Sequence, residues 1–228
     1  MPNNLPQEAE RLAELGYPVF PCFDPRTDPS TPGKRGKIPL VQGGVSSATT
    51  DLGQVAEWWS RWPTANIGLA CQNCLVFDLD TNGSKDGSSD LTRIADSLGP
   101  LESNMLTSTG SGGFHLYFKR PNDDIIGRAK VVWQGEQTGI DIRVGKQYAI
   151  APPSLHELGK HYEWIKPPVP PQELRDVPPE WVEQFLPKRE KELIVPQSLG
   201  WQLELPLRRN NPLPMVAELL DKIHDSRS

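Results

Sequence analysis

The spacing of apolar residues predicts helices and strands in an irregular order. Apolar positions three and four apart predict four helices, over 7–15, from Asp51 to Pro63, over 90–98 and over 180–186. Short apolar or alternating runs predict strands at 17–23, 67–70, 75–80, 105–109, 114–118, 139–144, 147–151 and 161–165. Because helices and strands do not alternate regularly, the pattern favours an α+β domain over a repeated βαβ unit.

The segments between these elements carry further predictions. The runs 67–70 and 75–80 flank Cys71-Gln-Asn-Cys74, so we expect a hairpin or two neighbouring strands. Residues 24–47 form a long polar loop rich in Pro, Gly, Lys and Arg, and a loop of this length in a compact domain is usually functional or mobile. An amphipathic helix is predicted near 214–224.

Composition narrows the class of protein. The 228 residues carry 24 Lys and Arg against 29 Asp and Glu, a net charge of −5, which argues against a uniformly basic nucleic-acid wrapper but leaves room for a local basic groove. No apolar run is long enough to span a membrane, the N-terminus lacks the pattern of a secretory signal, and three cysteines make no disulfide scaffold. We expect a cytoplasmic globular protein without membrane contact.

Two carboxylates close the strand Leu75-Val-Phe-Asp-Leu-Asp80. Side chains alternate along a strand, so Asp78 and Asp80 share one face with Val76, and the other face is apolar: Leu75, Phe77 and Leu79. Two like charges this close are costly unless a cation neutralises them, and Mg²⁺ and Mn²⁺ prefer carboxylate ligands. The alternative is an ordinary strand end whose acids face water.

A third acid lies in the alternating run Ile140-Asp-Ile-Arg-Val144. Asp141 and Arg143 share one face of that predicted strand. An acid beside a guanidinium suits a metal-bound anion, because the acid can hold the metal and the guanidinium a phosphate. The alternative is a weak ion pair on an exposed sheet face.

A glycine-rich loop precedes His115. Three glycines and two serines between Ser108 and Gly113 would let a ligand approach the backbone closely. His115 could donate to a phosphate, act as an acid–base group or be a buried core residue. Because three acids are expected on neighbouring strands, we favour the role beside a phosphate.

Three other features stay open or favour structure. The Cys71–Cys74 pair lacks the partner ligands that zinc needs, which favours a plain turn. The tryptophans at 58, 59 and 62 could stack bases, but their helical spacing favours core packing. The basic stretch 34–37 is either a solvated turn or a phosphate-grasping loop.

Taken in order, these motifs resemble the bifunctional DNA primase/polymerase (prim-pol) domain of the archaeo-eukaryotic primase superfamily. The resemblance covers about 170 positions, from about Leu12 to Phe185. It rests on these segments: 16–22, 37–40, 48–51, 58–70, 75–80, 107–118, 139–154 and 161–164.

The resemblance implies a fold and a site. It implies a primase-like catalytic core with an RRM-like antiparallel sheet flanked by helices, spanning 1–187, with a linker and helical tail over 188–228. It makes Asp78, Asp80 and Asp141 the ligands of two Mg²⁺ or Mn²⁺ ions and His115 the contact to the nucleotide triphosphate. The further phosphate contacts that it suggests are Lys37, Ser111, Arg143 and Lys146.

The implied activity is DNA primase and DNA polymerase, a nucleotidyl transfer that releases pyrophosphate. The expected partners are a single-stranded or primed DNA template, dNTPs (with NTPs as the alternative) and a replicative helicase, in a plasmid, phage or mobile element. No organic cofactor is expected. In the wider superfamily a serine often stands two positions before the histidine, where this chain has Gly113, so Ser111 is the candidate substitute.

Two other functions stay open. A replication-initiator module that binds DNA without catalysis would need the acids only for structure. A haloacid-dehalogenase-like phosphohydrolase also begins with Asp-x-Asp after a strand, but Thr81-Asn82 replaces the residues that family expects.

Overall fold

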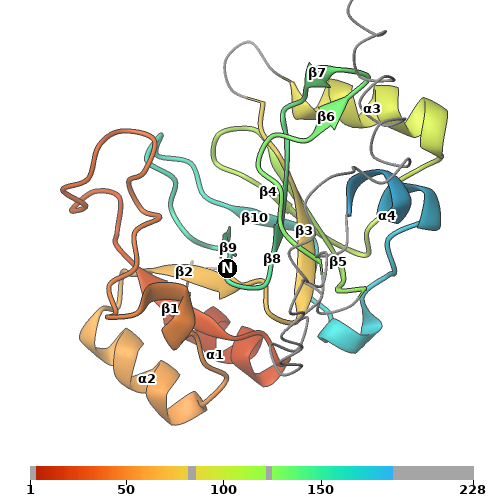
Figure 1. Ribbon diagram of the computed structural model, residues 1–228. Coiled ribbons are helices and arrows are strands. Elements are labelled where there is room, and N and C mark those ends of the chain that lie inside the picture. Colours follow the sequence, from red (N-terminus) through yellow and green to blue (C-terminus); the bar gives the residue numbers. More distant parts are fainter. Residues whose placement is uncertain (1–3, 82–85, 122–124, 187–228) are drawn as a thin grey trace, which may run out of the picture. The chain divides into compact units, whose positions relative to one another are not determined.

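In the computed structural model, residues 4–81, 86–121 and 125–186 are described, and their strands form two main antiparallel sheets (Figure 1). The smaller sheet has the order β1-β2-β9: β1 (Val19–Cys22), β2 (Asn66–Ala70) and β9 (Tyr148–Ala151). The larger sheet has the order β10-β4-β5-β3-β8: β3 (Cys74–Leu79), β4 (Met105–Ser108), β5 (Phe114–Lys119), β8 (Ile140–Val144) and β10 (Glu163–Lys166). A short ribbon joins β6 (Val132–Trp133) and β7 (Glu136–Gln137).

The predicted pairing of 67–70 with 75–80 is wrong. β2 pairs with β1 and β9, whereas β3 pairs with β5 and β8, so the two consecutive strands belong to different sheets. The chain crosses at Cys71, whose amide donates to the carbonyl of Gln147 and whose carbonyl accepts from Gly145. These bonds connect the crossing to the β8–β9 turn instead of closing a hairpin.

Four α-helices are present among the described residues: α1 (Leu5–Glu14), α2 (Leu52–Arg61), α3 (Gly87–Leu98) and α4 (Pro179–Phe185). Two single turns of 3₁₀-helix cover Gly44–Ser47 and Pro171–Glu173. Of Thr50 and Asp51, the two candidate caps for α2, the structure uses Asp51, which accepts from the amide of Gln54 at 2.7 Å. α3 begins earlier than predicted because Asp86 caps it, accepting from the amides of Ser88 and Ser89. The helix predicted near 214–224 lies outside the described residues.

The larger sheet is covered on both faces, whereas the alternation in β3 predicted packing only for the face of Leu75, Phe77 and Leu79. Leu75, Phe77 and Leu79 pack with residues of α3 and α4 such as Ile94 and Trp181. Val76 on the opposite face packs in a cluster that includes residues of α1, α2 and the smaller sheet. The face that carries Val76 also carries Asp78, so the two acids predicted to act together face the smaller sheet.

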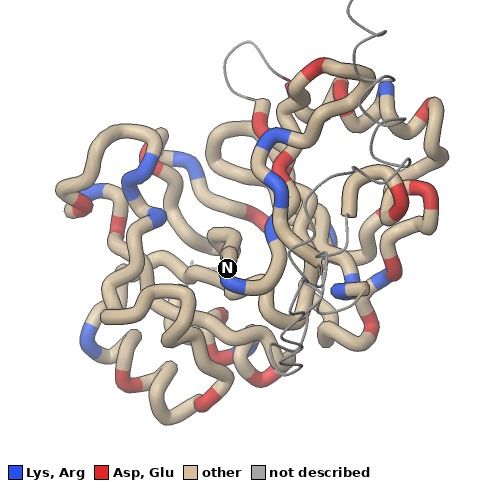
Figure 2. Tube along the Cα trace, viewed as in Figure 1, with Lys and Arg blue, Asp and Glu red and all other residues tan. Residues whose placement is uncertain are grey.

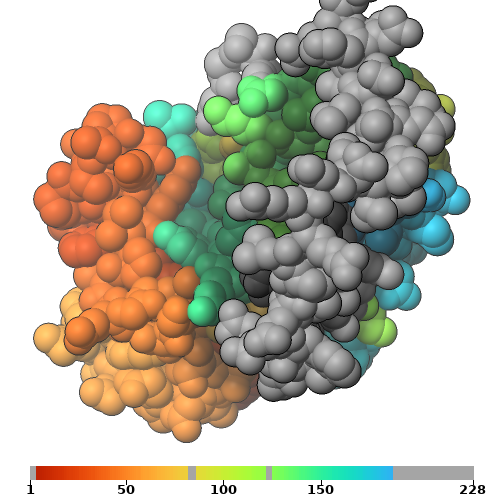
Figure 3. Space-filling view, viewed as in Figure 1, coloured from red at the N-terminus to blue at the C-terminus, as the bar shows by residue number. Residues whose placement is uncertain are grey.

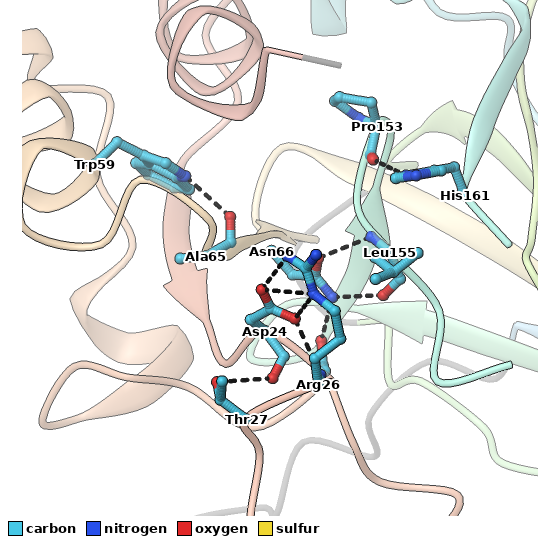
Figure 4. Close-up of polar contacts among 10 residues, drawn as sticks. Asp24, Arg26, Thr27, Trp59, Ala65, Asn66, Pro153, Leu155 and His161 are labelled. Carbon is cyan, nitrogen blue, oxygen red and sulfur yellow. Dashed lines mark hydrogen bonds and ion pairs between the residues drawn. The ribbon is translucent and has the colours of Figure 1, made fainter. Parts of the chain in front are cut away.

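The long loop over 24–47 is connected to the smaller sheet by Asn66 at the start of β2. Its side-chain amide donates to the carbonyls of Gly36 at 2.9 Å and Leu155 at 2.8 Å, and its side-chain oxygen accepts from the Leu155 amide (Figure 4). Within the loop, the guanidinium of Arg26 pairs with the carboxylate of Asp24. One buried side chain therefore connects two loops that border the smaller sheet.

Candidate active site

A row of polar side chains crosses the larger sheet. Asp78 in β3 lies opposite His115 in β5 on one side and opposite Asp141 in β8 on the other. Thr107 in β4 extends the row beyond His115, and Arg143 lies two residues along β8 from Asp141. Since residues at matched positions of paired strands share a face, all five point toward the smaller sheet.

Asp78, His115 and Arg143 of this row line a cavity of about 330 Å³. The lining residues come from both sheets and from the loops between them: Lys37, Asp78, Asp80, Thr109, Ser111, His115, Arg143, Lys146, Gln147, Tyr148, Ala149, Ile150 and Tyr162. Seven of the eight residues selected from the sequence are among them, and the eighth, Asp141, lies beside Asp78 in the row. In the space-filling view, the orange surface of the long loop lies beside the teal surface of the segments around β9 (Figure 3).

Asp78 is the electrostatic centre of the cavity. The side chain is buried, and both Nε and Nη2 of Arg143 donate to its Oδ2, the former at 2.7 Å. Burial by itself would raise the pKa of Asp78, but the nearby His115, Arg143 and Lys37 hold it below its ordinary value. Asp78 is therefore a carboxylate at neutral pH, paired with a guanidinium.

The other two acids differ from Asp78. Burial and the charges of Asp78 and Asp141 raise the pKa of Asp80. Asp141 accepts from the backbone amide of Lys130 at 2.6 Å and lies 3.6 Å from Nη2 of Arg143. Asp80 thus retains the uncompensated negative charge in the group.

His115 is buried beside Asp78, with its Nε2 3.4 Å from Oδ1 of that carboxylate. Its Nδ1 is buried and has no hydrogen-bond partner among the described residues. Burial lowers the pKa of His115, so the ring is neutral at neutral pH. The tyrosine ring of Tyr162 packs against it, with ring centroids 5.9 Å apart.

The glycine-rich loop brings Ser111 to the cavity and keeps the loop close to β3. The hydroxyls of Ser111 and Thr109 lie 2.9 Å apart, and the Gly113 amide donates to Thr109 Oγ1 at 2.9 Å. A Cβ on Gly113 would lie 2.1 Å from the carbonyl oxygen of Leu79. Position 113 therefore has no room for a side chain, and Ser111 supplies a hydroxyl that lines the cavity.

Lysines and tyrosines complete the cavity. Lys37 and Lys146 both line it, and the hydroxyl of Tyr148 donates to the Lys37 carbonyl at 2.7 Å. Burial raises the pKa of Tyr148 to about 12, so it stays a neutral donor. Lys34 and Arg35 are exposed on the loop and do not line the cavity. Lys and Arg positions gather on that loop and on the segments flanking β8 (Figure 2).

Four polar cavity residues escaped the sequence analysis: Thr109, Gln147, Tyr148 and Tyr162. Each stands inside a segment already selected by motif, but none carries a charge or a metal-ligand pattern. Their roles depend on β9 and the 153–162 segment lying across the cavity from β3. The sequence offered no signal for that packing.

The carboxylates of Asp78, Asp80 and Asp141 are suitable ligands for a divalent cation, although the described residues are not arranged as a metal-binding cluster. Among the described residues, no three His, Cys, Asp or Glu side chains are arranged to hold a metal ion. Burial first, and then repulsion from Asp78 and Asp141, raises the pKa of Asp80. A bound cation would relieve that repulsion, and carboxylate oxygens are ligands that Mg²⁺ and Mn²⁺ prefer. Cys71 and Cys74 are buried free thiols, in line with a structural turn.

Comparison with known proteins identifies one family. The family described as bifunctional DNA primase/polymerase, N-terminal, matches residues 9–181. No curated protein that was compared matches the chain. No helix in the described part of the chain has the length and apolar character to span a membrane.

Proposed function

The chain belongs to the bifunctional DNA primase/polymerase family, and from this premise we propose that it transfers nucleotides to a growing strand in the cavity between its two sheets. The reaction joins the 3′-hydroxyl of a primer or initiating nucleotide to the α-phosphorus of a nucleoside triphosphate and releases pyrophosphate. The observation that supports this site is the convergence of carboxylates, cations and His115 on one cavity from distant parts of the chain.

Three cations and one hydroxyl bind the triphosphate in this proposal. Lys37, Lys146 and Arg143 line the cavity from a loop, a turn and a strand, and Ser111 offers a hydroxyl from the glycine-rich loop. Charge neutralisation and positioning supply most of the catalysis in phosphoryl transfer. Arg143 has a second role, because in the absence of substrate it neutralises Asp78.

We propose Asp78, Asp80 and Asp141 as the ligands of divalent cations. A bound Mg²⁺ or Mn²⁺ would lower the pKa of the attacking hydroxyl and neutralise charge on the leaving pyrophosphate. Asp78 is ionised at neutral pH, and the raised pKa of Asp80 makes its charge depend on pH in the acidic range. His115, whose Nε2 lies 3.4 Å from Oδ1 of Asp78, contacts the triphosphate in this proposal.

Several finer points belong to the same proposal. We infer an RRM-like arrangement of the larger sheet, a catalytic domain over 1–187 with a separate tail over 188–228, and a cytoplasmic role in replicating a plasmid, phage or mobile element. The substrates are a DNA template with dNTPs, with NTPs as the alternative, and a helicase is the expected partner. These inferences rest on family membership alone.

Primer synthesis tests the proposal directly. On single-stranded DNA with dNTPs or NTPs and Mg²⁺ or Mn²⁺, we expect the unchanged protein to make and extend primers. Asp78→Asn and Asp80→Asn each remove one negative charge and should lower the rate at least about 100-fold, because each removes a proposed ligand of the catalytic cation. Asp96→Asn, on the exposed face of α3, is the matched control and should keep full activity.

Two outcomes would contradict this function. Full activity of the Asp78→Asn, Asp80→Asn double variant would exclude the carboxylates from catalysis. Metal-independent DNA binding without any nucleotide incorporation would favour the replication-initiator module. Metal-dependent binding of dNTPs separates the enzyme from that module.

A further inference from the structure

A second surface pocket lies where the C-terminal end of α2 meets the long loop. Its volume is about 380 Å³. The lining residues come from the loop and from α2 and its cap: Leu40, Val41, Gln42, Ser47, Trp58, Arg61 and Trp62. We name this pocket the tryptophan groove. None of its lining residues is a carboxylate, and Arg61 brings a positive charge.

Trp62 in this groove does not contribute to the core. Trp59 is fully buried and its Nε1 donates to the carbonyl of Ala65 at 3.0 Å (Figure 4). Trp58 is half-buried and packs on two core clusters. Among the tryptophans that the structure describes, Trp62 alone belongs to none of the three core clusters, although it is also half-buried. The sequence prediction of core packing therefore holds for Trp59 but not for Trp62.

Arg61 gives the groove a cation beside an aromatic face. Its guanidinium carbon lies 4.7 Å from the ring centroid of Trp62. Arg61 is exposed, and within residues 4–81, 86–121 and 125–186 no acidic side chain forms an ion pair with it. An aromatic ring beside an arginine is the combination that binds a base by stacking and the adjoining phosphate by charge.

The groove is a short way from the catalytic cavity along the loop. Lys37 lines the cavity and Leu40 lines the groove, so the three intervening steps of chain span at most about 11 Å. Both sites also rest on one small cluster: Tyr148 of the cavity and Trp58 of the groove pack against its members, which are Phe20, Cys22, Ile150 and Tyr162. The cavity and the tryptophan groove are therefore both next to this cluster of buried residues.

We propose that the tryptophan groove binds an unpaired base of a single-stranded nucleic acid. The base stacks on Trp62 in place of the guanidinium of Arg61, which moves to contact the neighbouring phosphate. Resting on the proposed function, this site would hold the template strand a few nucleotides from the reacting position. Aromatic-lined grooves also bind proline-rich peptides, but the free guanidinium and the nearby phosphate-binding cavity favour nucleic acid.

Binding to a labelled oligothymidylate tests the proposal, measured by fluorescence anisotropy on the full chain without metal or nucleotide. Trp62→Ala should weaken binding roughly five- to 100-fold, as loss of one stacked base does, and Trp62→Phe should retain most of it. Arg61→Ala should weaken binding and lower the salt dependence by about one phosphate contact. Arg11→Ala, an exposed arginine on α1, is the control and should bind normally.

An oligonucleotide of abasic sites separates stacking from charge. The unchanged protein should bind this oligonucleotide more weakly than oligothymidylate. Trp62→Ala and the unchanged protein should bind it with equal affinity. Thermal unfolding should show Trp62→Ala as stable as the unchanged protein, because Trp62 is in no core cluster. If Trp62→Ala proves unstable, the test uses Trp62→Phe, which should keep most of the binding, and Arg61→Ala, which should weaken it. The weaker binding of the abasic oligonucleotide to the unchanged protein then tests for stacking.

The proposal is overturned if Trp62→Ala binds oligothymidylate with normal affinity. It is also overturned if this variant loses as much affinity for the abasic oligonucleotide as for oligothymidylate. A polyproline peptide that binds in a Trp62-dependent way, while oligothymidylate does not, would overturn it too. Failure of the proposed function looks different. In that case the Asp78 and Asp80 variants keep their activity, or no synthesis occurs, while Trp62→Ala still loses strand binding.

Discussion

Asp78 and Asp80 are two residues apart, yet their surroundings give them opposite behaviour. Burial would raise the pKa of Asp78, but His115 and the guanidinium of Arg143 beside it outweigh that effect and lower the pKa. Asp80 lies just beyond the end of β3 and accepts no hydrogen bond from Arg143. Burial and the neighbouring carboxylates raise its pKa. The pair thus combines an acid that is charged at neutral pH with one whose charge a bound cation would stabilise.

The raised pKa of Asp80 predicts a conflict between stability and activity. Because its pKa is raised, Asp80 holds its proton more tightly in the folded protein than in the unfolded chain. The resulting contribution to the free energy of unfolding is complete below the ordinary pKa of 3.8. It is lost as the pH rises through the pKa that Asp80 has in the folded protein. At neutral pH the ionised side chain repels Asp78 and Asp141. Asp80→Asn should therefore stabilise the fold by about 0.5 kcal/mol at pH 7, a modest gain because solvent screens the exposed charge, while abolishing synthesis.

Urea unfolding at pH 7 and at acidic pH measures this gain, which should shrink as the pH falls and Asp80 becomes protonated. Asp96→Asn is again the matched control, expected to change neither quantity. Equal stability of Asp80→Asn and the unchanged protein at both pH values would contradict the predicted repulsion.

Removing Arg143 should be costly because it leaves Asp78 buried without its main partner. We expect Arg143→Ala to lower the free energy of unfolding by about 2–3 kcal/mol at pH 7, and Asp78→Asn in the same chain to restore part of it. Because the pKa of Asp78 is lowered in the folded protein, its ionised form stabilises the fold above the ordinary pKa of 3.8. This stabilisation is lost as the pH falls through the pKa of the folded protein. The destabilisation caused by Arg143→Ala should therefore become smaller in acid.

A double-mutant cycle in urea measures the coupling between these two residues. Arg175→Ala is the control, because its pair with Glu102 is exposed on both sides and should cost less than about 0.5 kcal/mol. Additive effects of Arg143→Ala and Asp78→Asn would show that the pair is not coupled.

At the scale of elements, the site depends on how closely the glycine-rich loop approaches β3. The loop joins β4 to β5, and the backbone of Gly113 lies directly against the carbonyl of Leu79 at the strand end. This contact places Asp80, His115 and Ser111 around one cavity. A side chain at position 113 would collide with this carbonyl, so the close approach requires glycine.

Gly113→Ala should therefore reduce both stability and activity. The added methyl group would have to push the loop away from β3, which costs about 1–3 kcal/mol and moves Asp80 relative to His115. Thermal unfolding and primer extension measure the two effects. Gly53→Ala in α2 is the control: the added Cβ lies 3.2 Å from Oδ1 of the cap Asp51, while alanine favours the helix, so it should change stability far less than Gly113→Ala.

For the whole molecule, the distribution of charge matters more than its sum. The net charge of −5 disfavours a negatively charged partner, but Lys37, Arg143 and Lys146 line one cavity, and Lys34 and Arg35 lie on the same loop as Lys37. The carboxylates in that cavity are proposed cation ligands, whose charge a bound metal would offset. A locally basic site can thus exist on an acidic protein.

Template binding should accordingly be weak and sensitive to salt. Three to five phosphate contacts predict that the logarithm of affinity falls with the logarithm of salt concentration with a slope of about −2 to −3.5. Anisotropy with a single-stranded oligonucleotide over a salt series gives the slope. Lys37→Ala should make it less steep by about 0.7, whereas Arg175→Ala should not change it. Affinity independent of salt would contradict a phosphate-based interface.

The sequence by itself determined the local features of this protein. Alternation in the 75–80 and 140–144 segments placed Asp78, Asp141 and Arg143 on definite strand faces, because the side-chain period of a strand depends only on the backbone. Helix positions followed from apolar spacing, and the ordered motifs identified the family that residues 9–181 match.

Only the tertiary structure decided which of these local pieces meet. It placed the consecutive strands β2 and β3 in different sheets, brought Tyr148 and Tyr162 to the cavity, paired Arg143 with Asp78, and left Trp62 outside the core. Local pattern could not predict these results, because hydrogen bonding between strands and packing between sheets depend on residues far apart in the chain. The same long-range packing sets the burial and charge surroundings that make Asp78 and Asp80 differ.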